Sequence, residues 1–165
     1  MKEVERKFVL DAPPPGLEQY PSKALAQGYL AIDPAGSEVR VRRKDDETLM
    51  TVKIGIGLVR GEEEFAIERD RFERLWAMTA GRRVVKRRYF VPLDGGLTAE
   101  VDLYEGDLAG LVTAEIEFPD EATALAYVPP PWLGTDVTGD VRYANRTLAT
   151  DGIPTPAAPR AARGS

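Results

Sequence analysis

Apolar and polar side chains alternate along most of this sequence, with the two-residue period of half-buried β-strands. The alternation predicts one strand at the start of the chain and seven more after it. These seven lie at 27–32, 38–43, 49–54, 62–67, 84–91, 98–104 and 112–118. The runs Asp33-Pro34-Ala35-Gly36 and Leu93-Asp94-Gly95-Gly96 have the composition of tight turns.

Three segments follow the spacing of helices instead. Residues 70–80 place their apolar side chains on one helical face, and Asp70 is positioned to cap its start. Shorter helices are predicted over 120–127, with Asp120 as the cap, and over 139–149. Many antiparallel strands with a few helices between them predict an α+β fold that is mainly β, built as a barrel or a curved sheet.

The length of 165 residues suits one domain with a substantial core. We expect that domain over 1–150, followed by a disordered tail over 151–165 that is rich in Pro, Ala, Arg and Gly. No apolar run approaches the roughly 20 residues that span a membrane, and no signal peptide opens the sequence. We therefore expect a cytoplasmic protein without a membrane partner.

The composition excludes several kinds of chemistry. The chain has no cysteine and no histidine, which removes disulfides, thiolate nucleophiles, Ser-His-Asp triads and His-bound metals. Catalysis must then depend on carboxylates, Lys, Arg, Tyr or a metal that oxygen ligands hold. The net charge of −5 argues against a nucleic-acid partner.

Charged residues gather on one face of the predicted strands, as pairs two positions apart. Most pairs have a single sign, such as Arg40 with Arg42, although Lys7 follows Glu3 and Glu5 in the first strand. The acidic candidates are Glu3, Glu5, Glu62, Glu64, Glu100, Asp102, Glu115 and Glu117. The basic candidates are Lys7, Arg40, Arg42, Lys53, Lys86, Arg88 and Arg142.

A single strand of this kind is more often an ordinary solvated strand. The set as a whole differs, because like charges two positions apart repel unless an opposite charge lies between them. Basic pairs favour a polyanion, and carboxylate pairs favour Mg²⁺ or Mn²⁺. If the charged faces converge in a closed barrel, its lumen is charged, and a ligand would offset the cost of such an interior.

The residues that carry these charges form motifs in a fixed order. The first is Glu3-Val4-Glu5-Arg6-Lys7. The others include Gln27-Gly28-Tyr29-Leu30, Val39-Arg40-Val41-Arg42, Thr51-Val52-Lys53, Val85-Lys86-Arg87-Arg88-Tyr89, Glu100-Val101-Asp102, Ala114-Glu115-Ile116-Glu117-Phe118 and Asp140-Val141-Arg142-Tyr143. In these motifs residues 1–150 resemble the CYTH superfamily of triphosphate tunnel metalloenzymes, and above all its short bacterial members that hydrolyse inorganic tripolyphosphate.

The resemblance implies a closed eight-stranded antiparallel β-barrel, a tunnel with a charged lumen and a few flanking helices. It implies that Glu3, Glu5, Glu115 and Glu117 hold Mg²⁺ or Mn²⁺. The phosphates would be bound by Lys7, Arg40, Arg42, Lys53, Lys86, Arg88 and Arg142. The catalytic residues would be Glu3, Glu5, Lys86 and Arg88, and Glu62, Glu64, Glu100 and Asp102 would support them. The implied reaction yields pyrophosphate and phosphate.

Several alternatives stay open at this point. Val141 and Ala144 stand where related sequences often have lysines, so fewer basic side chains are expected near Arg142. The same motifs occur in nucleoside and thiamine triphosphatases and in adenylate cyclases, and a non-catalytic polyphosphate or nucleotide sensor is a third possibility. Trp76 and Trp132 are expected to pack in the core rather than to bind a nucleobase. The sequence leaves a monomer and a homodimer equally open.

Overall fold

The structure is a computed structural model, and it describes residues 4–54 and 61–155. Its strands are β1 (Val4–Val9), β2 (Ser22–Ile32), β3 (Glu38–Lys44), β4 (Glu47–Ile54), β5 (Gly61–Ala66), β6 (Arg83–Pro92), β7 (Thr98–Tyr104), β8 (Val112–Phe118) and β9 (Thr135–Asp136). Its α-helices are α1 (Arg69–Trp76), α2 (Glu121–Ala126) and α3 (Asn145–Asp151). Short 3₁₀ helices include η2 (Ala77–Thr79), η5 (Pro131–Leu133) and η6 (Val141–Tyr143).

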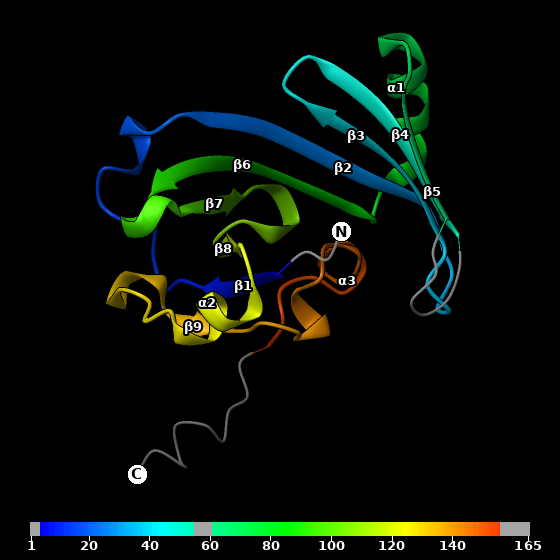
Figure 1. Cartoon of the computed structure of the whole chain (residues 1–165). Coiled ribbons are helices and arrows are strands. Elements are labelled where there is room, and N and C mark those ends of the chain that lie inside the picture. Colours follow the sequence, from blue (N-terminus) through cyan, green and yellow to red (C-terminus); the bar gives the residue numbers. More distant parts are fainter. Residues whose placement is uncertain (1–3, 55–60, 156–165) are drawn as a thin grey trace.

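The nine strands form one antiparallel sheet in the order β5-β4-β3-β2-β6-β7-β8-β1-β9. The sheet is strongly curved, and β5 and β9 lie at its two ends (Figure 1). Among the described residues these ends do not pair with each other. The mainly β fold with a curved sheet is therefore confirmed, whereas the expected closed eight-stranded barrel is not what these residues form.

The sheet stays open because another segment covers the outer edge of β1. Strand β9 pairs with Phe8 and Val9, and the N–H of Val137 donates to the carbonyl of Lys7 at 2.8 Å. The hydroxyl of Thr138 accepts from the N–H of Lys7 at 3.0 Å. These backbone groups of β1 are thus not available to a further strand. At the other end every residue of β5 is exposed, and its run of glutamates disfavours pairing along that edge.

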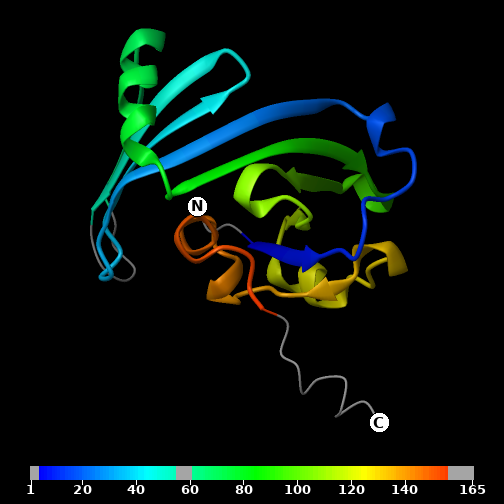
Figure 2. The ribbon, with the colours of Figure 1, turned by 180° about the vertical axis from the view of Figure 1, so that it is seen from behind.

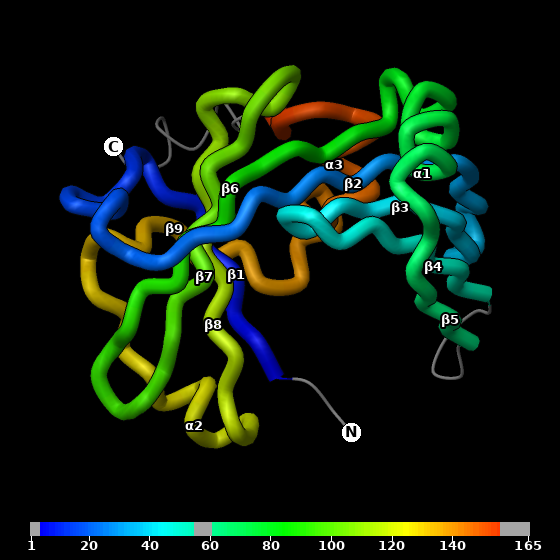
Figure 3. Tube along the Cα trace, turned by 90° about the horizontal axis from the view of Figure 1, so that it is seen from above, coloured from blue at the N-terminus to red at the C-terminus, as the bar shows by residue number. Residues whose placement is uncertain are grey.

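The apolar core lies mainly on the convex side of the sheet. Phe8, Val101, Ala114 and Ile116 are fully buried there, and α2 and η5 add Ala124 and Leu133. Helix α1 packs with Phe72 on the convex side of the arm that β3 and β4 form, as seen from behind and from above (Figures 2 and 3). Helix α3 packs on the concave side, against β2 and β6.

Local sequence signals explain most of the connections. Gly95 and Gly96 both have φ of 76°, which suits the predicted hairpin turn between β6 and β7. The carboxylate of Asp120 accepts from the N–H of Thr123 at 2.7 Å and caps α2 as predicted. The predicted cap at Asp70 is wrong, because α1 begins at Arg69, so that Asp70 lies inside the first helical turn.

Three segments differ from the predicted elements. The helix predicted over 139–149 is divided into η6 and α3 by Ala144, whose backbone is extended. Strand β2 begins at Ser22 rather than at residue 27, and β9 was not predicted. The tail expected over 151–165 overlaps the end of α3, and its part over 156–165 lies outside the described residues. In the described part of the chain, no helix has the length and apolarity needed to cross a membrane.

A charged concave face as the candidate functional site

The strand register places the predicted charged pairs on one face of the sheet. Directly paired residues of an antiparallel sheet point to the same side, and Glu5 pairs with Glu117, Lys7 with Glu115, and Arg88 with Asp102. The pairings across β3, β4 and β5 continue this face to the far end of the sheet. We call it the charged face; it contains Glu5, Lys7, Arg40, Arg42, Lys53, Glu62, Glu64, Lys86, Arg88, Glu100, Asp102, Glu115 and Glu117. Glu3 lies outside the described residues.

Asp102 is the buried centre of this face. Its carboxylate is fully buried and accepts from Arg88 through two bonds, of 2.8 and 2.9 Å. The ammonium of Lys86 lies 2.9 Å from the same carboxylate. Burial alone would raise the pKa of Asp102, but Lys86 and Arg88 outweigh it and hold that pKa below its ordinary value. The carboxylate therefore stays ionised and fixes two cations in place.

The two cations of this centre differ in their surroundings. Lys86 is 5 % exposed, and its ammonium lies 5.3 Å from the centroid of the Tyr104 ring. Burial would lower the pKa of Lys86, but Tyr104 and Asp102 raise it overall. Arg88 also forms an ion pair of 3.1 Å with Glu100, so both neighbouring carboxylates of β7 hold its guanidinium. Lys86 and Arg88 thus remain charged and aligned across the pH range of ordinary enzymes.

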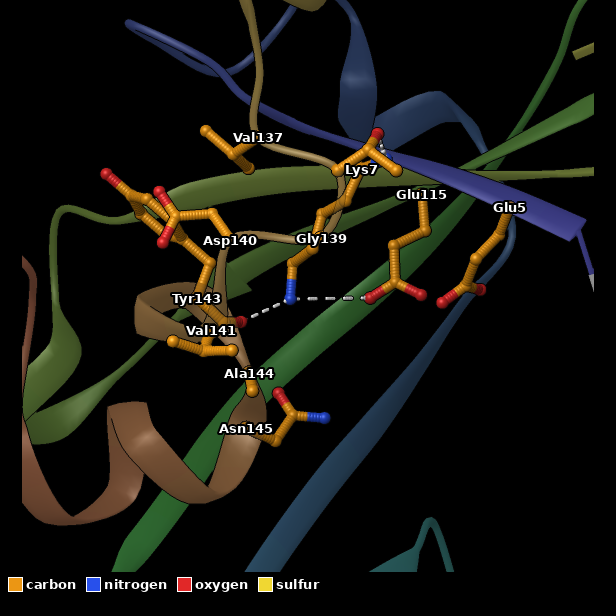
Figure 4. A pocket seen from close by; sticks show the side chains of 11 residues that line it. Glu5, Lys7, Glu115, Val137, Gly139, Asp140, Val141, Tyr143, Ala144 and Asn145 are labelled. Carbon is orange, nitrogen blue, oxygen red and sulfur yellow. Dashed lines mark hydrogen bonds and ion pairs between the residues drawn. The ribbon is translucent and has the colours of Figure 1, made fainter. Parts of the chain in front are cut away.

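A second group of charges lies where β1 and β8 meet the segment after β9. The ammonium of Lys7 donates to the carbonyl of Tyr143 at 2.6 Å and lies 3.7 Å from Glu115 (Figure 4). Burial lowers the pKa of Lys7 despite the attraction of Glu115. The carboxylates of Glu5 and Glu115 lie beside each other at a cavity of about 540 Å³, which Lys7 and residues 137–141 and 143–145 also line.

The arm of β3, β4 and β5 adds two arginines. Arg40 forms an ion pair with Glu38 at 3.3 Å, and Arg42 forms one with Glu64 at 3.2 Å. The Nε atoms of both arginines are buried and have no hydrogen-bond partner among the described residues. A buried donor without a partner destabilises a fold, so these two atoms favour an anionic ligand on this arm.

The carboxylates of β1, β7 and β8 have the oxygen donors that Mg²⁺ and Mn²⁺ prefer. Burial and the charges of Glu115, Asp102 and Glu117 raise the pKa of Glu100 although Arg88 opposes them. This crowding of negative charge suits a bound cation. Within residues 4–54 and 61–155, however, no three carboxylates are already grouped closely enough to hold a metal ion. The carboxylate oxygens of this face therefore fit a divalent cation. Glu3, another predicted ligand of that cation, lies outside the described residues.

Two of the predicted phosphate ligands lie apart from these groups. Lys53 is on the charged face near its end, opposite Glu38 and Glu62. Arg142 is half-exposed in η6, where its guanidinium pairs with Asp140 at 2.6 Å, and it does not line the cavity beside Lys7.

The predicted packing of the tryptophans is confirmed, since Trp76 stacks on Phe72 at 5.6 Å and Trp132 packs against the convex core.

Sequence reasoning missed Lys23 and Asn145. Lys23 would have been found by extending the alternation of β2 back to Ser22. Asn145 belongs to the late motif that begins at Val137, but the motif gives it no role; the fold brings its Oδ1 to 3.5 Å from the ammonium of Lys86.

A curved antiparallel sheet with paired basic and acidic side chains on one face has the chemistry of a polyanion-binding protein. The chain is 43 % identical to an inorganic triphosphatase of Nitrosomonas europaea, over 90 % of this chain and 97 % of that protein. It is 36 % identical to an inorganic triphosphatase of Acetivibrio thermocellus, over 89 % of this chain and 92 % of that protein. The chain therefore belongs to the inorganic triphosphatase family, in agreement with its resemblance to the CYTH superfamily.

Solved structures agree with this assignment. A crystal structure of an inorganic triphosphatase superimposes with a TM-score of 0.80 at 40 % identity, over 94 % of this chain and 98 % of that one. A scan against descriptions of protein families matches none of them to the chain.

Proposed function

We propose that this protein hydrolyses inorganic tripolyphosphate to pyrophosphate and phosphate on its charged face, with Mg²⁺ or Mn²⁺ as the cofactor. The family of the chain supports the substrate, because both curated relatives are inorganic triphosphatases. The observation that carries the proposal is the pair of buried Nε atoms of Arg40 and Arg42. No described residue accepts a hydrogen bond from them, and they lie on a face already lined with Lys86 and Arg88.

Basic side chains from both halves of the sheet would bind the phosphates. Lys86 and Arg88 are held by Asp102, so they lose little conformational freedom when the substrate binds. Arg40 and Arg42 offer Nε donors that have no partner in the described part of the chain, from the arm of β3. In the reaction, water attacks the terminal phosphorus and the bond to the bridging oxygen breaks. The bases stabilise the charge on the departing pyrophosphate.

A carboxylate of the charged face would accept the proton of the attacking water, since the chain has no histidine. Glu5, Glu115 and Glu117, joined by Glu3, would hold the divalent cation. When bound, this cation neutralises phosphate charge and lowers the pKa of water. The substrate thus needs the acidic and the basic parts of the same face.

A phosphate-release assay with Mg²⁺ or Mn²⁺ tests the function across tripolyphosphate, ATP, thiamine triphosphate and pyrophosphate. We expect tripolyphosphate to be hydrolysed fastest and a chelator to stop the reaction. Clearly faster release from ATP or thiamine triphosphate would refute the proposed substrate.

A pair of variants sharpens the same assay. Glu117→Gln removes a proposed metal ligand from an exposed position, so turnover should fall by on the order of a hundredfold while the thermal midpoint hardly changes. Glu63→Gln is the control, because Glu63 is exposed on the opposite face of β5. Equal activity of the two variants would remove Glu117 from the metal site.

Hydrolysis of an organic triphosphate is the second candidate. The cavity beside Lys7 has an apolar wall of Val137, Val141, Tyr143 and Ala144, and its volume of about 540 Å³ has room for more than three phosphates. The substrate comparison above separates this candidate from the first.

A further inference from the structure

Lys23 belongs to the charged face, although the sequence analysis did not select it. It pairs with Arg88 in the register of β2 and β6, so the two side chains point to the same side. Its ammonium lies 6.0 Å from the centroid of the Phe90 ring, which confirms that orientation. The side chain is exposed at the rim of the face.

Lys23 differs from its neighbours in its charge balance. Lys7, Lys86, Arg40, Arg42 and Arg88 each have a carboxylate at ion-pair distance. No carboxylate of the described residues pairs with Lys23, so its positive charge is not neutralised within this part of the chain.

The contrast is greatest beside Arg88. Its guanidinium donates twice to Asp102 and pairs with Glu100 at 3.1 Å, and Lys86 shares Asp102. Two cations and two carboxylates therefore balance each other at this position. An anion that approaches Arg88 meets a neutral cluster, and Lys23 supplies the additional positive charge.

A second cavity on the charged face includes Phe90 in its wall, although Lys23 itself is not among its lining residues. This cavity of about 590 Å³ is lined by Phe90, Glu100, Glu117 and residues 95–98, and not by Lys7. Its two carboxylates would repel a polyphosphate. The ammonium of Lys23, 6.0 Å from the centroid of the Phe90 ring, supplies a positive charge near this wall that would offset the repulsion.

We propose that Lys23 is a substrate-binding residue that contacts the end of the tripolyphosphate lying nearest Arg88. The proposal rests on the proposed function and adds a binding residue to it. Because the ammonium touches phosphate in the bound state and in the transition state alike, it acts on substrate affinity rather than on the chemical step.

The test is Lys23→Met, which keeps a flexible apolar stem over Phe90 and removes the charge. We expect KM for tripolyphosphate to rise by on the order of tenfold, as for the loss of one charge-assisted contact, with kcat within about twofold of wild type. The fall of kcat/KM with salt should also become shallower. Lys23→Arg should restore most of the affinity.

Arg87→Gln is the matched control. Arg87 follows along β6 but points to the convex side, where it donates to Ser22 at 3.0 Å. The Arg87→Gln variant loses one positive charge, as Lys23→Met does. We expect its KM to stay within about twofold of wild type, because Arg87 should make no direct contact with the substrate. An unchanged KM in Lys23→Met, or an equal rise in Arg87→Gln, would overturn the proposal.

Calorimetric binding of tripolyphosphate separates this proposal from the proposed function. If the wild type releases no phosphate from tripolyphosphate, the proposed function fails on its own. The binding measurement still tests the proposed role of Lys23. Weaker binding of tripolyphosphate to Lys23→Met than to Arg87→Gln supports that role, and equal affinities refute it.

Discussion

Asp102 is the residue on which the alignment of two proposed phosphate ligands depends. It is fully buried and accepts from Arg88 and Lys86 together. Removing one member of a buried ion pair leaves the remaining charge without compensation, which costs more than the pair itself contributes. An exposed pair of the same kind, such as Arg142 with Asp140, is screened by water and contributes little.

Asp102→Asn should therefore lower the free energy of unfolding by about 3–5 kcal/mol and reduce turnover as well. Asp140→Asn, in the exposed pair, should change it by less than about 1 kcal/mol. Urea denaturation of the two variants measures both values. Similar losses in the two proteins would show that burial does not distinguish these carboxylates.

Strand β9 is the element that shapes the end of the sheet. It is two residues long, yet its continuation over Val137 and Thr138 binds the backbone of Lys7 and leads into the cavity wall. Arg6 stabilises this docking, since it donates to Asp136 at 2.8 Å and to the carbonyls of Ala124 and Tyr127 at 2.9 Å. A short strand thus positions one end of the proposed site.

The approach of this segment to β1 depends on Gly134. Its φ is 74°, and a Cβ at this position would collide with the carbonyl of Val9. We expect Gly134→Ala to destabilise the protein by about 1–3 kcal/mol and to weaken tripolyphosphate binding, because β9 can no longer dock closely.

Gly139→Ala is the control for the backbone angle alone. Its φ of 78° is similar, but a Cβ there meets no atom within 4 Å. Thermal denaturation and calorimetry should show the larger loss for Gly134→Ala. Equal losses would mean that the left-handed backbone, and not the contact with Val9, sets the cost.

At the scale of the whole molecule, stability should depend on pH through the buried charges. The pKa of Asp102 is lowered on folding, so its contribution is complete above the ordinary value of 3.8 and is lost as the pH falls through the folded value. The pKa of Lys86 is raised, so its contribution is complete below 10.5 and is lost as the pH rises through the folded value.

We therefore expect the free energy of unfolding to be nearly constant around neutral pH, to fall in acid below about pH 4 and to fall in strong alkali. Urea titrations at a series of pH values measure this profile. The same loss in acid for Asp102→Asn as for the wild type would show that Asp102 does not cause it.

The sequence allowed the charged face to be predicted, because alternation assigns each side chain of a strand to one of two sides. Glu115 and Arg40 could be placed on it without the structure. Closure of the sheet could not be predicted, because it depends on whether another segment covers the edge of β1. Lys23 was missed because Ser22, Ala24 and Ala26 are too small to give β2 a clear apolar pattern there.

The pairing of β1 with β8 also has a consequence for the timing of folding. Val4 pairs with Phe118, so the first strand of the chain cannot take its place until the eighth has been synthesised. At about 5–20 residues per second, a ribosome leaves β1 without its partner for roughly 5–20 seconds. Glu5 and Lys7 therefore join the proposed site among the last of its residues, because a nascent chain that ends before β8 lacks Glu115 and Glu117 and the strand that holds β1 in place.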